Sequence, residues 1–467
     1  MYEENGIIYN SEYKTIVKGY NIEKISDSNI VLPPSVKKIA RKAFANIYAP
    51  DATFTIPDSV NFIEESAFEY ASFKKVIIEE GPYVIDRGAF LASDVPEFVL
   101  PKSVKKIEAK AFIYSNVKKI NLENIEYYAT ASFYQTGLES LTLNKNVEGI
   151  EEKAFSHCTS LKYVFYGPSI LYIPADCFYL SGVETFEFGS DTEIIGDSAF
   201  ASSRLKNITF PNSLSTIGNA AFENTLLENI SIPSSVTSIG NFAFSNCDHL
   251  KQITIEEGTT PLSLKKCCFA TNKKLKNMII PARVNSMDSE ILSDCPNIET
   301  ISVYANTNNL PGAFANNCTN LKNIYLAPNI KHLEFQCFAA TGLEEVNENF
   351  KNIESFRESA FKDCKNLSKA VFYPNANNPK APLIGPKIFE GCDNLKNIFI
   401  LGNLPAFTNA FSKINSDVVV YAPEYKPSDF NKDSASHICT DKKLMEEEIV
   451  DMFPFRKASK IIEEIER

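Results

Sequence analysis

Cysteine and histidine are the residues of this chain most suited to metal or catalytic chemistry, and neither has the spacing that such chemistry needs. The sequence contains 11 cysteines and 4 histidines, with no Cys-x-x-Cys and no H-E-x-x-H. Cys267 and Cys268 are adjacent, so their side chains would point in different directions, which disfavours a shared metal or a redox pair. The histidines are scattered, at His157, His249, His332 and His437. We therefore expect no metal centre, no cofactor and no catalytic residues.

The cysteines follow a repeating pattern instead. Five lie three residues after a recurrent Phe or its substitute Leu292, one is displaced by a single position, and three directly precede the Phe. In that order they are Cys158, Cys247, Cys295, Cys364 and Cys392; Cys318; and Cys177, Cys268 and Cys337. Placement by repeat position predicts small buried thiols rather than ligands.

The Phe marks a repeat that runs through most of the chain. It usually follows an Ala, as in Ala221-Phe222 and Ala243-Phe244. The markers are Phe44, Phe68, Phe90, Phe112, Phe133, Phe155, Phe178, Phe200, Phe222, Phe244, Phe269, Leu292, Phe314, Phe338, Phe361, Phe389 and Phe411. These 17 copies recur about every 23 residues, a period typical of solenoids.

Each copy predicts one short strand followed by turns. Leu250-x-x-Ile253-x-Ile255 alternates with the period of a strand, with the isoleucines facing inward. A proline ends the strand in several copies, because it cannot donate to a continuing ladder. A Ser-Val or Ser-Leu turn and an Ile-Gly step come next, and we expect the Ala-Phe stretch after them to be helical. Stacked copies would bury a core that no single copy could bury alone.

The repeat resembles the BspA-like (Treponema pallidum-type) leucine-rich repeat. The shared pattern is L-x-x-I-x-I-P-x-S-V-x-x-I-G-x-x-A-F-x-x-C-x-x-L; residues 229 to 250 carry it almost without departure, and the match extends from about 30 to 421. The resemblance implies an α/β leucine-rich repeat solenoid of about 17 turns, with a curved parallel β-sheet on its concave side. It also implies a cell-surface or secreted adhesin that contacts host, matrix or microbial macromolecules.

Three segments follow from the limits of the repeat. We expect a capping hairpin in residues 1–29, the solenoid in 30–423 with its last strand at 418–423, and a helical cap or tail in 424–467. The C-terminal helices either cap the last turn, bind a partner or lead to a further segment. Residues 373–386 are rich in Pro and Asn and predict a loop, either a recognition loop or a tolerated insertion.

The amino-acid composition limits the classes of partner that the chain could bind. With 44% hydrophobic and 22% charged residues the chain is globular, and its net charge of −11 argues against a nucleic-acid partner. The sequence shows neither a signal peptide nor an apolar stretch of transmembrane length. An intracellular scaffold or effector is therefore the alternative to the adhesin. The sequence indicates no oligomeric state.

The outward side chains of the strands are free to specify a partner. Most are small, polar and uncharged, and the exceptions are aromatic: Tyr163, Phe165, Tyr325 and Phe399. Aromatic side chains are common in the binding hot spots of protein interfaces. These four residues are the candidate contacts for a protein or other macromolecular ligand, through the concave face.

Overall fold

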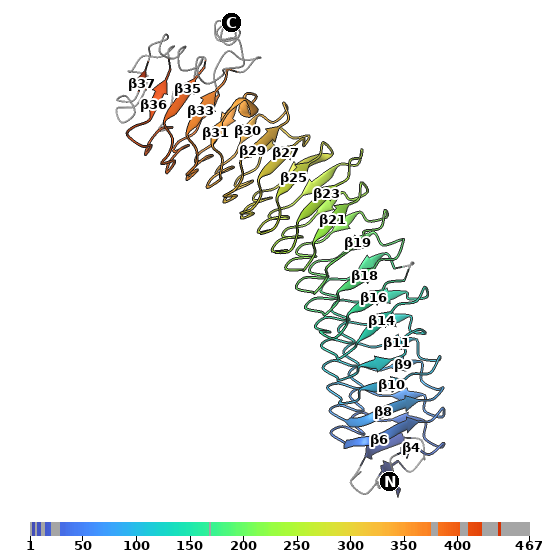
Figure 1. The fold of residues 1–467 in the computed structure, drawn as a ribbon. Coiled ribbons are helices and arrows are strands. Elements are labelled where there is room, and N and C mark those ends of the chain that lie inside the picture. The colour runs from blue at the N-terminus through green and yellow to red at the C-terminus, as the bar shows by residue number, and fades with distance from the viewer. Residues whose placement is uncertain are drawn as a thin grey trace. The chain divides into compact units, whose positions relative to one another are not determined.

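The protein is described from a computed structural model that defines residues 2–4, 7–10, 15–19, 29–167, 170–374, 382–401, 410–422 and 438–439. It is a parallel β-solenoid of about 16 turns of about 23 residues, as the sequence predicts. The chain divides into two compact units, Met1–Cys247 (unit 1) and Asp248–Arg467 (unit 2). Figure 1 shows the strands of each unit stacked one beside the next.

Most turns of unit 1 contribute one strand to each of two ladders, which are divided into several sheets; the turn of Asn207 adds only an isolated bridge to the first ladder. The first ladder comprises β4 (Asn29–Val31), β6 (Tyr48–Ile56), β8 (Ser72–Ile78), β10 (Glu97–Val99), β12 (Lys119–Ile120), β14 (Ser140–Thr142), β16 (Tyr163–Phe165), β18 (Thr185–Glu187) and β21 (Asn229–Ile232). The second comprises β5 (Lys38–Ile39), β7 (Phe62–Ile63), β9 (Val84–Ile85), β11 (Lys106–Ile107), β13 (Tyr127–Tyr128), β15 (Gly149–Ile150), β17 (Tyr172–Ile173), β19 (Ile194–Ile195), β20 (Thr216–Ile217) and β22 (Ser238–Ile239).

Unit 2 has the same two ladders. The first comprises β23 (Gln252–Ile255), β25 (Asn277–Ile280), β27 (Thr300–Val303), β29 (Asn323–Leu326), β31 (Glu345–Val346), β33 (Lys369–Phe372), β35 (Asn397–Ile400), β36 (Val419–Tyr421) and β37 (Ile438–Cys439). The second comprises β24 (Leu262–Leu264), β26 (Val284–Met287), β28 (Asn309–Leu310), β30 (His332–Leu333), β32 (Ser355–Phe356) and β34 (Leu383–Ile384). A short 3-10 helix, η2, spans Glu348–Phe350.

Additional strands extend the repeat array at both of its ends. At the N-terminal end β1 (Tyr2–Glu4) and β3 (Thr15–Gly19) both pair antiparallel with β2 (Ile7–Tyr9), and β3 pairs in parallel with β5. At the other end the segment 418–423 is not the last strand, because β37 pairs in parallel with β36. The predicted helices of the segment 424–467 and the central part of the loop 373–386 lie outside the described residues.

The Ala-Phe stretch forms tight turns, which corrects the prediction of a helix. In residues 67–71 every second backbone N–H donates to the carbonyl three residues earlier: Ala67 to Glu64, Glu69 to Ser66 and Ala71 to Phe68, each at 3.1 Å. The residues two before and two after the Phe, Ser66 and Tyr70, have φ of 58° and 57°. Left-handed residues four positions apart in one stretch cannot belong to a right-handed helix.

This turn geometry serves contacts between neighbouring turns. The N–H groups of the Phe and of the residues two before and two after it donate to the next turn. For Phe68 these bonds are Ser66 N to Arg87 O at 3.2 Å, Phe68 N to Ala89 O at 2.7 Å, and Tyr70 N to Leu91 O at 2.9 Å. The same set recurs around most of the other markers. The turn side of the solenoid is thus a hydrogen-bonded ladder without being a β-sheet.

The Phe rings stack inside this ladder. From Phe44 to Phe244 in unit 1, consecutive rings lie 4.9–5.7 Å apart between centroids, at interplanar angles of 4–13°. Each of these rings is fully buried. Phe-on-Phe stacking follows because identical positions of successive turns lie one above another. The proline after a strand then starts a β-turn: Val60 N donates to Pro57 O at 3.0 Å, and Val60 is buried.

One marker of unit 2 lies in a different position from the one the sequence suggests. Leu292 N donates to Phe314 O, and Ala315 N donates to Cys337 O, both at 2.9 Å. In other turns the N–H of the Phe donates to the carbonyl of the residue that precedes the next Phe. Phe314 therefore takes the Ala position, Ala315 takes the Phe position, and Phe314 meets Phe338 edge-on at 79°. This shift also brings Cys318 to three residues after the Phe position, the same place as the five other cysteines.

The cysteines three residues after the Phe position form a buried row with the Ser and Thr residues that take the same position in other turns. Their thiols donate to the carbonyl of the Phe position one turn earlier, as Cys158 does to Phe133 at 3.0 Å and Cys318 to Leu292 at 3.2 Å. Thr136 approaches the Cys158 sulfur at 3.2 Å. Burial raises the pKa of Cys158 to about 11 and that of Cys295 to about 12. The prediction of buried structural thiols is confirmed for the ten cysteines whose side chains are described.

The exchanged pair Phe314-Ala315 gives a double-mutant test of the repeat geometry. Phe314→Ala opens a cavity and should lower the free energy of unfolding by about 3–5 kcal/mol. Ala315→Phe overpacks the Phe position and should cost about 1–3 kcal/mol. The double variant restores Ala-Phe, so its cost in urea unfolding should fall well below the sum of the two. Additive costs would contradict the assigned positions.

Buried thiols should resist labelling in the native protein. In a Cys439→Ser variant, which leaves the ten described thiols, we expect less than one thiol per chain to react with Ellman's reagent at pH 8 before unfolding. All ten are buried, and the raised pKa values keep Cys158 and Cys295 as unreactive thiols at that pH. In denaturant all ten should react. Rapid labelling of several thiols in the folded chain would show that this row is open.

Candidate functional site

The outward face of the first ladder, called the strand face below, is a regular surface whose residue types the core does not dictate. Strands β14, β16 and β18 each present an exposed, a buried and an exposed residue in succession. Strands β21, β23 and β25 show the same alternation. The buried members pack in the core, so only the exposed ones are available to a partner.

Unit 1 places two aromatic side chains together on this face. Tyr163 and Phe165 are 40% and 37% exposed and flank the fully buried Val164 on β16. The Tyr163 hydroxyl donates to Glu187 Oε1 on β18 at 2.8 Å. This hydrogen bond to a carboxylate raises the pKa of Tyr163 above its usual value. The bond joins Tyr163 to the neighbouring strand, so both predicted residues lie on one ordered patch.

Small side chains frame this aromatic pair. Tyr163 lies between Ser140 of β14 and Thr185 of β18 in the register of the ladder. Phe165 lies between Thr142 and Glu187. Because these neighbours are short, apart from Glu187, they leave the two rings raised above the sheet. The rings can therefore enter a pocket of a partner, as hot-spot residues do.

Unit 2 has a second apolar patch on its strand face. Tyr325 of β29 is 48% exposed, as predicted. In the register of the ladder it lies beside Ser302 of β27, and Ser302 lies beside Ile279 of β25. Ile279 is 56% exposed. The row Ile279, Ser302, Tyr325 thus presents two large apolar side chains with a small one between them. Ile279 was not among the predicted contacts, although its outward position in the strand marks it as one.

Phe399 is wrongly predicted to be exposed. It is fully buried, and its ring stacks on Tyr421 with centroids 4.7 Å apart and planes 4° apart. Val371, its neighbour on β33, is also buried, so the alternation of exposed and buried residues ends in this part of unit 2. On β33 and β35 only the first residues, Lys369 and Asn397, are partly exposed, and the three residues that follow in each strand are buried. Phe399 therefore contributes to packing and is not a surface contact.

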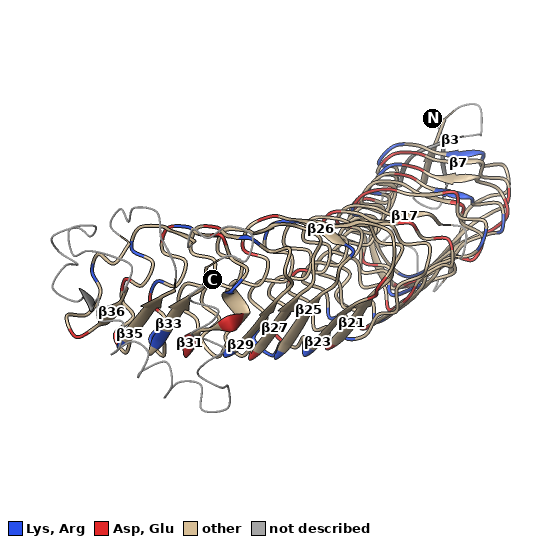
Figure 2. Cartoon of the chain, turned by 90° about the horizontal axis from the view of Figure 1, so that it is seen from above, with Lys and Arg blue, Asp and Glu red and all other residues tan. Residues whose placement is uncertain are grey.

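Charged residues on the strand face are paired across neighbouring strands. Lys75 of β8 lies 2.6 Å from Glu97 of β10, and Lys369 of β33 lies 3.0 Å from Glu345 of β31. Figure 2 shows acidic and basic positions interspersed along the chain rather than gathered by sign. Such cross-strand pairs balance basic side chains with acidic ones, so these lysines form no basic patch that would steer a polyanion.

The described residues offer no assembled metal site. In the ranges that the structure defines, no group of three or more His, Cys, Asp or Glu side chains is placed to hold a metal ion. The three histidines there lie on separate turns, and burial lowers the pKa of His157. In the same ranges no helix has the length and apolar character needed to cross a membrane.

Known proteins share this repeat and fold. The family model described as "BspA type Leucine rich repeat region (6 copies)" matches residues 15–136, 123–251, 237–368 and 313–424. A leucine-rich repeat protein from Bacteroides ovatus is 20% identical, covers 90% of this chain and 98% of its own, and has a TM-score of 0.61. At this identity the likeness shows the fold alone.

Two further solved structures are similar over much of the chain but superpose poorly. A leucine rich cell surface protein from Faecalibacterium prausnitzii is 20% identical over 89% of this chain and 98% of its own, with a TM-score of 0.34. The pneumococcal vaccine antigen PcpA is 17% identical over 76% of this chain and 92% of its own, with a TM-score of 0.31. The comparison with curated proteins found no match. Since the family model spans most of its length, the chain belongs to the BspA-type leucine-rich repeat family.

Proposed function

We propose that the chain is a non-enzymatic binding protein that holds a protein or other macromolecular ligand on its strand face. The observation that carries this proposal is the exposed pair Tyr163 and Phe165, fixed on one strand and held there by the bond from Tyr163 to Glu187. Leucine-rich repeat solenoids are generally used for protein binding, which supports the same conclusion.

Rigidity is the physical reason why a strand is a good place for such contacts. A side chain on a hydrogen-bonded ladder with buried neighbours has little freedom left to lose when a partner binds. Aromatic rings supply a large contact area with only two rotatable bonds. Tyr163 and Phe165 therefore combine area with order, and Ile279 and Tyr325 do the same in unit 2.

The compartment in which the protein acts is also part of the proposal. We infer an adhesin that acts at the cell surface or after secretion and contacts host, matrix or microbial macromolecules, as the family resemblance implies. The alternative is an intracellular scaffold or effector. The cysteines favour that alternative, because all ten that are described are free thiols, as in proteins kept in a reducing compartment.

Substitution of the aromatic pair tests the strand face of unit 1. Purified fibronectin, laminin and collagen are the first probes, and the affinity of any that binds is measured by surface plasmon resonance. The change Tyr163→Ala/Phe165→Ala should weaken binding about tenfold to a hundredfold, because hot-spot side chains contribute about 2 kcal/mol or more. Tyr163→Phe should keep most of the affinity, since it removes only the bond to Glu187.

The control separates the strand face from exposed aromatics in general. Tyr83→Ala removes a tyrosine that is 59% exposed but lies on no strand, and it should leave binding unchanged. The change Ile279→Ser/Tyr325→Ala reports on unit 2 in the same assay. If a bound ligand keeps its full affinity against both double variants, the strand face is not its binding site.

The compartment is tested separately in cells that express the natural gene. We expect the chain in the culture medium or on intact cells, where it should be degraded by externally added protease. A cytosolic enzyme measured in parallel should stay intact. Recovery of the chain only from the cytosol, protected from protease until lysis, would replace the adhesin with the intracellular scaffold.

A further inference from the structure

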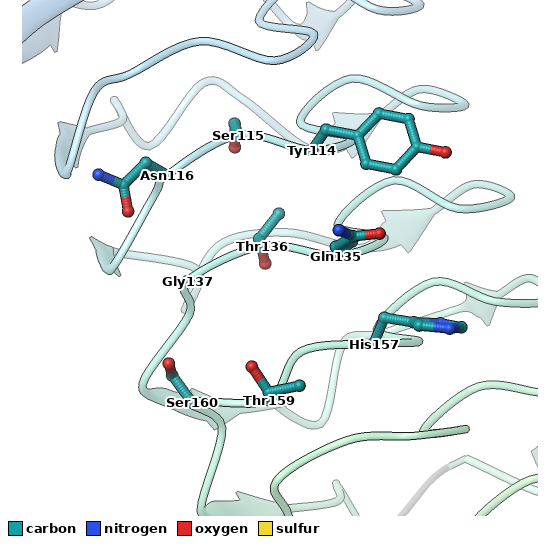
Figure 3. Close-up of a pocket in the computed structure, with 9 residues that line it drawn as sticks. All are labelled: Tyr114, Ser115, Asn116, Gln135, Thr136, Gly137, His157, Thr159 and Ser160. Atoms are coloured by element: carbon teal, nitrogen blue, oxygen red, sulfur yellow. The ribbon is translucent and has the colours of Figure 1, made fainter.

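A pocket of about 420 Å³ lies in unit 1, on the segments that lead from the turns toward the strands of the first ladder. Three successive turns, those of Phe112, Phe133 and Phe155, form it with nine lining residues. Figure 3 shows Tyr114, Gln135 and His157 projecting in one direction, one from each turn, while Asn116 and Ser160 lie on the opposite side. The volume is within the range of small-ligand sites.

The turn geometry fixes the three projecting side chains. Tyr114, Gln135 and His157 each lie two residues after the Phe, where φ is 60°, 54° and 61°. Their backbone N–H groups bond to the next turn, as Tyr114 N does to Tyr134 O at 2.9 Å. The pocket is therefore formed in advance by the backbone ladder and needs no rearrangement to receive a ligand.

Gly137 opens the middle of the pocket. A Cβ at this residue would lie 3.3 Å from Asn116 Oδ1, closer than most such contacts, so a side chain here would crowd the lining. The Asn116 amide is oriented, because its Nδ2 donates to Asp94 Oδ1 at 2.9 Å. This leaves the Asn116 carbonyl oxygen on the side of Gly137, where it can accept a hydrogen bond.

A row of aromatic rings borders the pocket. Tyr134 lies 5.7 Å from Tyr114 and 4.7 Å from His157, and His157 lies 5.5 Å from Tyr179, between ring centroids. The Ser156 hydroxyl donates to Tyr179 O at 3.2 Å and lies 2.9 Å from His157 Nδ1. When this hydroxyl donates to Tyr179 it accepts from His157 Nδ1–H, and in that tautomer His157 Nε2 is an acceptor.

The lining is neutral. None of the nine residues is Lys, Arg, Asp or Glu, although such residues make up 22% of the chain. The amides of Asn116 and Gln135 and the hydroxyls of Thr159 and Ser160 offer both donors and acceptors. A phosphate or carboxylate ligand would find no cation among these nine residues, although Lys118 lies beside Gly137. An apolar ligand would leave these polar groups without partners.

We propose that this pocket binds a neutral sugar residue of a glycan. A sugar presents hydroxyl groups that both donate and accept, which match the amides and hydroxyls of the lining. It also presents a face of C–H bonds, which packs on an aromatic ring such as that of Tyr114. The site is independent of the strand face and gives the protein a second class of ligand.

The test uses the full chain and four neutral trisaccharides, built from glucose, galactose, mannose or N-acetylglucosamine. Each is titrated by calorimetry to about 10 mM, since sites of this size bind single sugars with affinities as weak as about 1 mM. At least one should bind with one site per chain. Tyr114→Ala should weaken that binding about tenfold and Gln135→Ala by a smaller factor.

Matched controls decide the location. Tyr70→Ala removes a tyrosine of similar exposure at the same turn position, 57% against 53% for Tyr114, outside the pocket, and should leave sugar binding unchanged. The strand-face variant Tyr163→Ala/Phe165→Ala should also bind the sugar normally. Lack of binding by all four trisaccharides, or binding that survives both pocket variants, would overturn the proposal. Circular dichroism checks that each variant is folded.

Discussion

The hydrogen-bonded contact between neighbouring turns is the constraint on which the rest of this structure depends. Around the Phe of a typical turn, three N–H groups donate to the next turn, and the Phe ring stacks on its neighbour. This geometry needs a left-handed residue on each side of the Phe, at about 1–2 kcal/mol each. Three hydrogen bonds at about 1 kcal/mol each and one ring pair offset that cost. An isolated turn loses those partners, so the fold exists only as an array.

This constraint also decides which residues remain free for function. Most core positions hold Phe, Ile, Leu, Val or small residues such as Ala, Cys and Ser, because they repeat in every turn; the buried Tyr128 and Tyr166 are exceptions. Free choice remains at the exposed strand positions and at the second residue after the Phe. The two proposed sites use these two sets: Tyr163 and Phe165 stand on strands, and Tyr114, Gln135 and His157 stand on turns. One scaffold therefore supports two unrelated kinds of contact.

The sequence alone predicts the repeat, the strand positions and the buried cysteines, since each depends on spacing and hydrophobicity. The sequence-based prediction of a helix fails at the turns, because Ala, Glu and Lys favour a helix. Residue types such as those of Ser66 and Tyr70 do not indicate a positive φ. The sequence does not reveal that Phe314 and Ala315 exchange the Ala and Phe positions, because Phe314 recurs at almost the expected spacing. Phe399 was placed on the surface by strand alternation, which cannot detect a strand in which successive residues are buried. The pocket depends on how three turns superpose, so no single stretch of sequence reveals it.

Deletion of one complete turn tests the central claim most directly, namely that the stacked turn is the unit of structure. Thr216 and Ser238 are register partners in neighbouring turns, so removal of residues 216–237 joins Ser215 to an equivalent position. The account predicts that this variant folds and unfolds cooperatively, with circular dichroism like that of the parent. Removal of residues 216–226, half a turn, should break the Phe stack and the ladder. If the complete-turn deletion unfolds the protein as severely as the half-turn deletion, the account is contradicted.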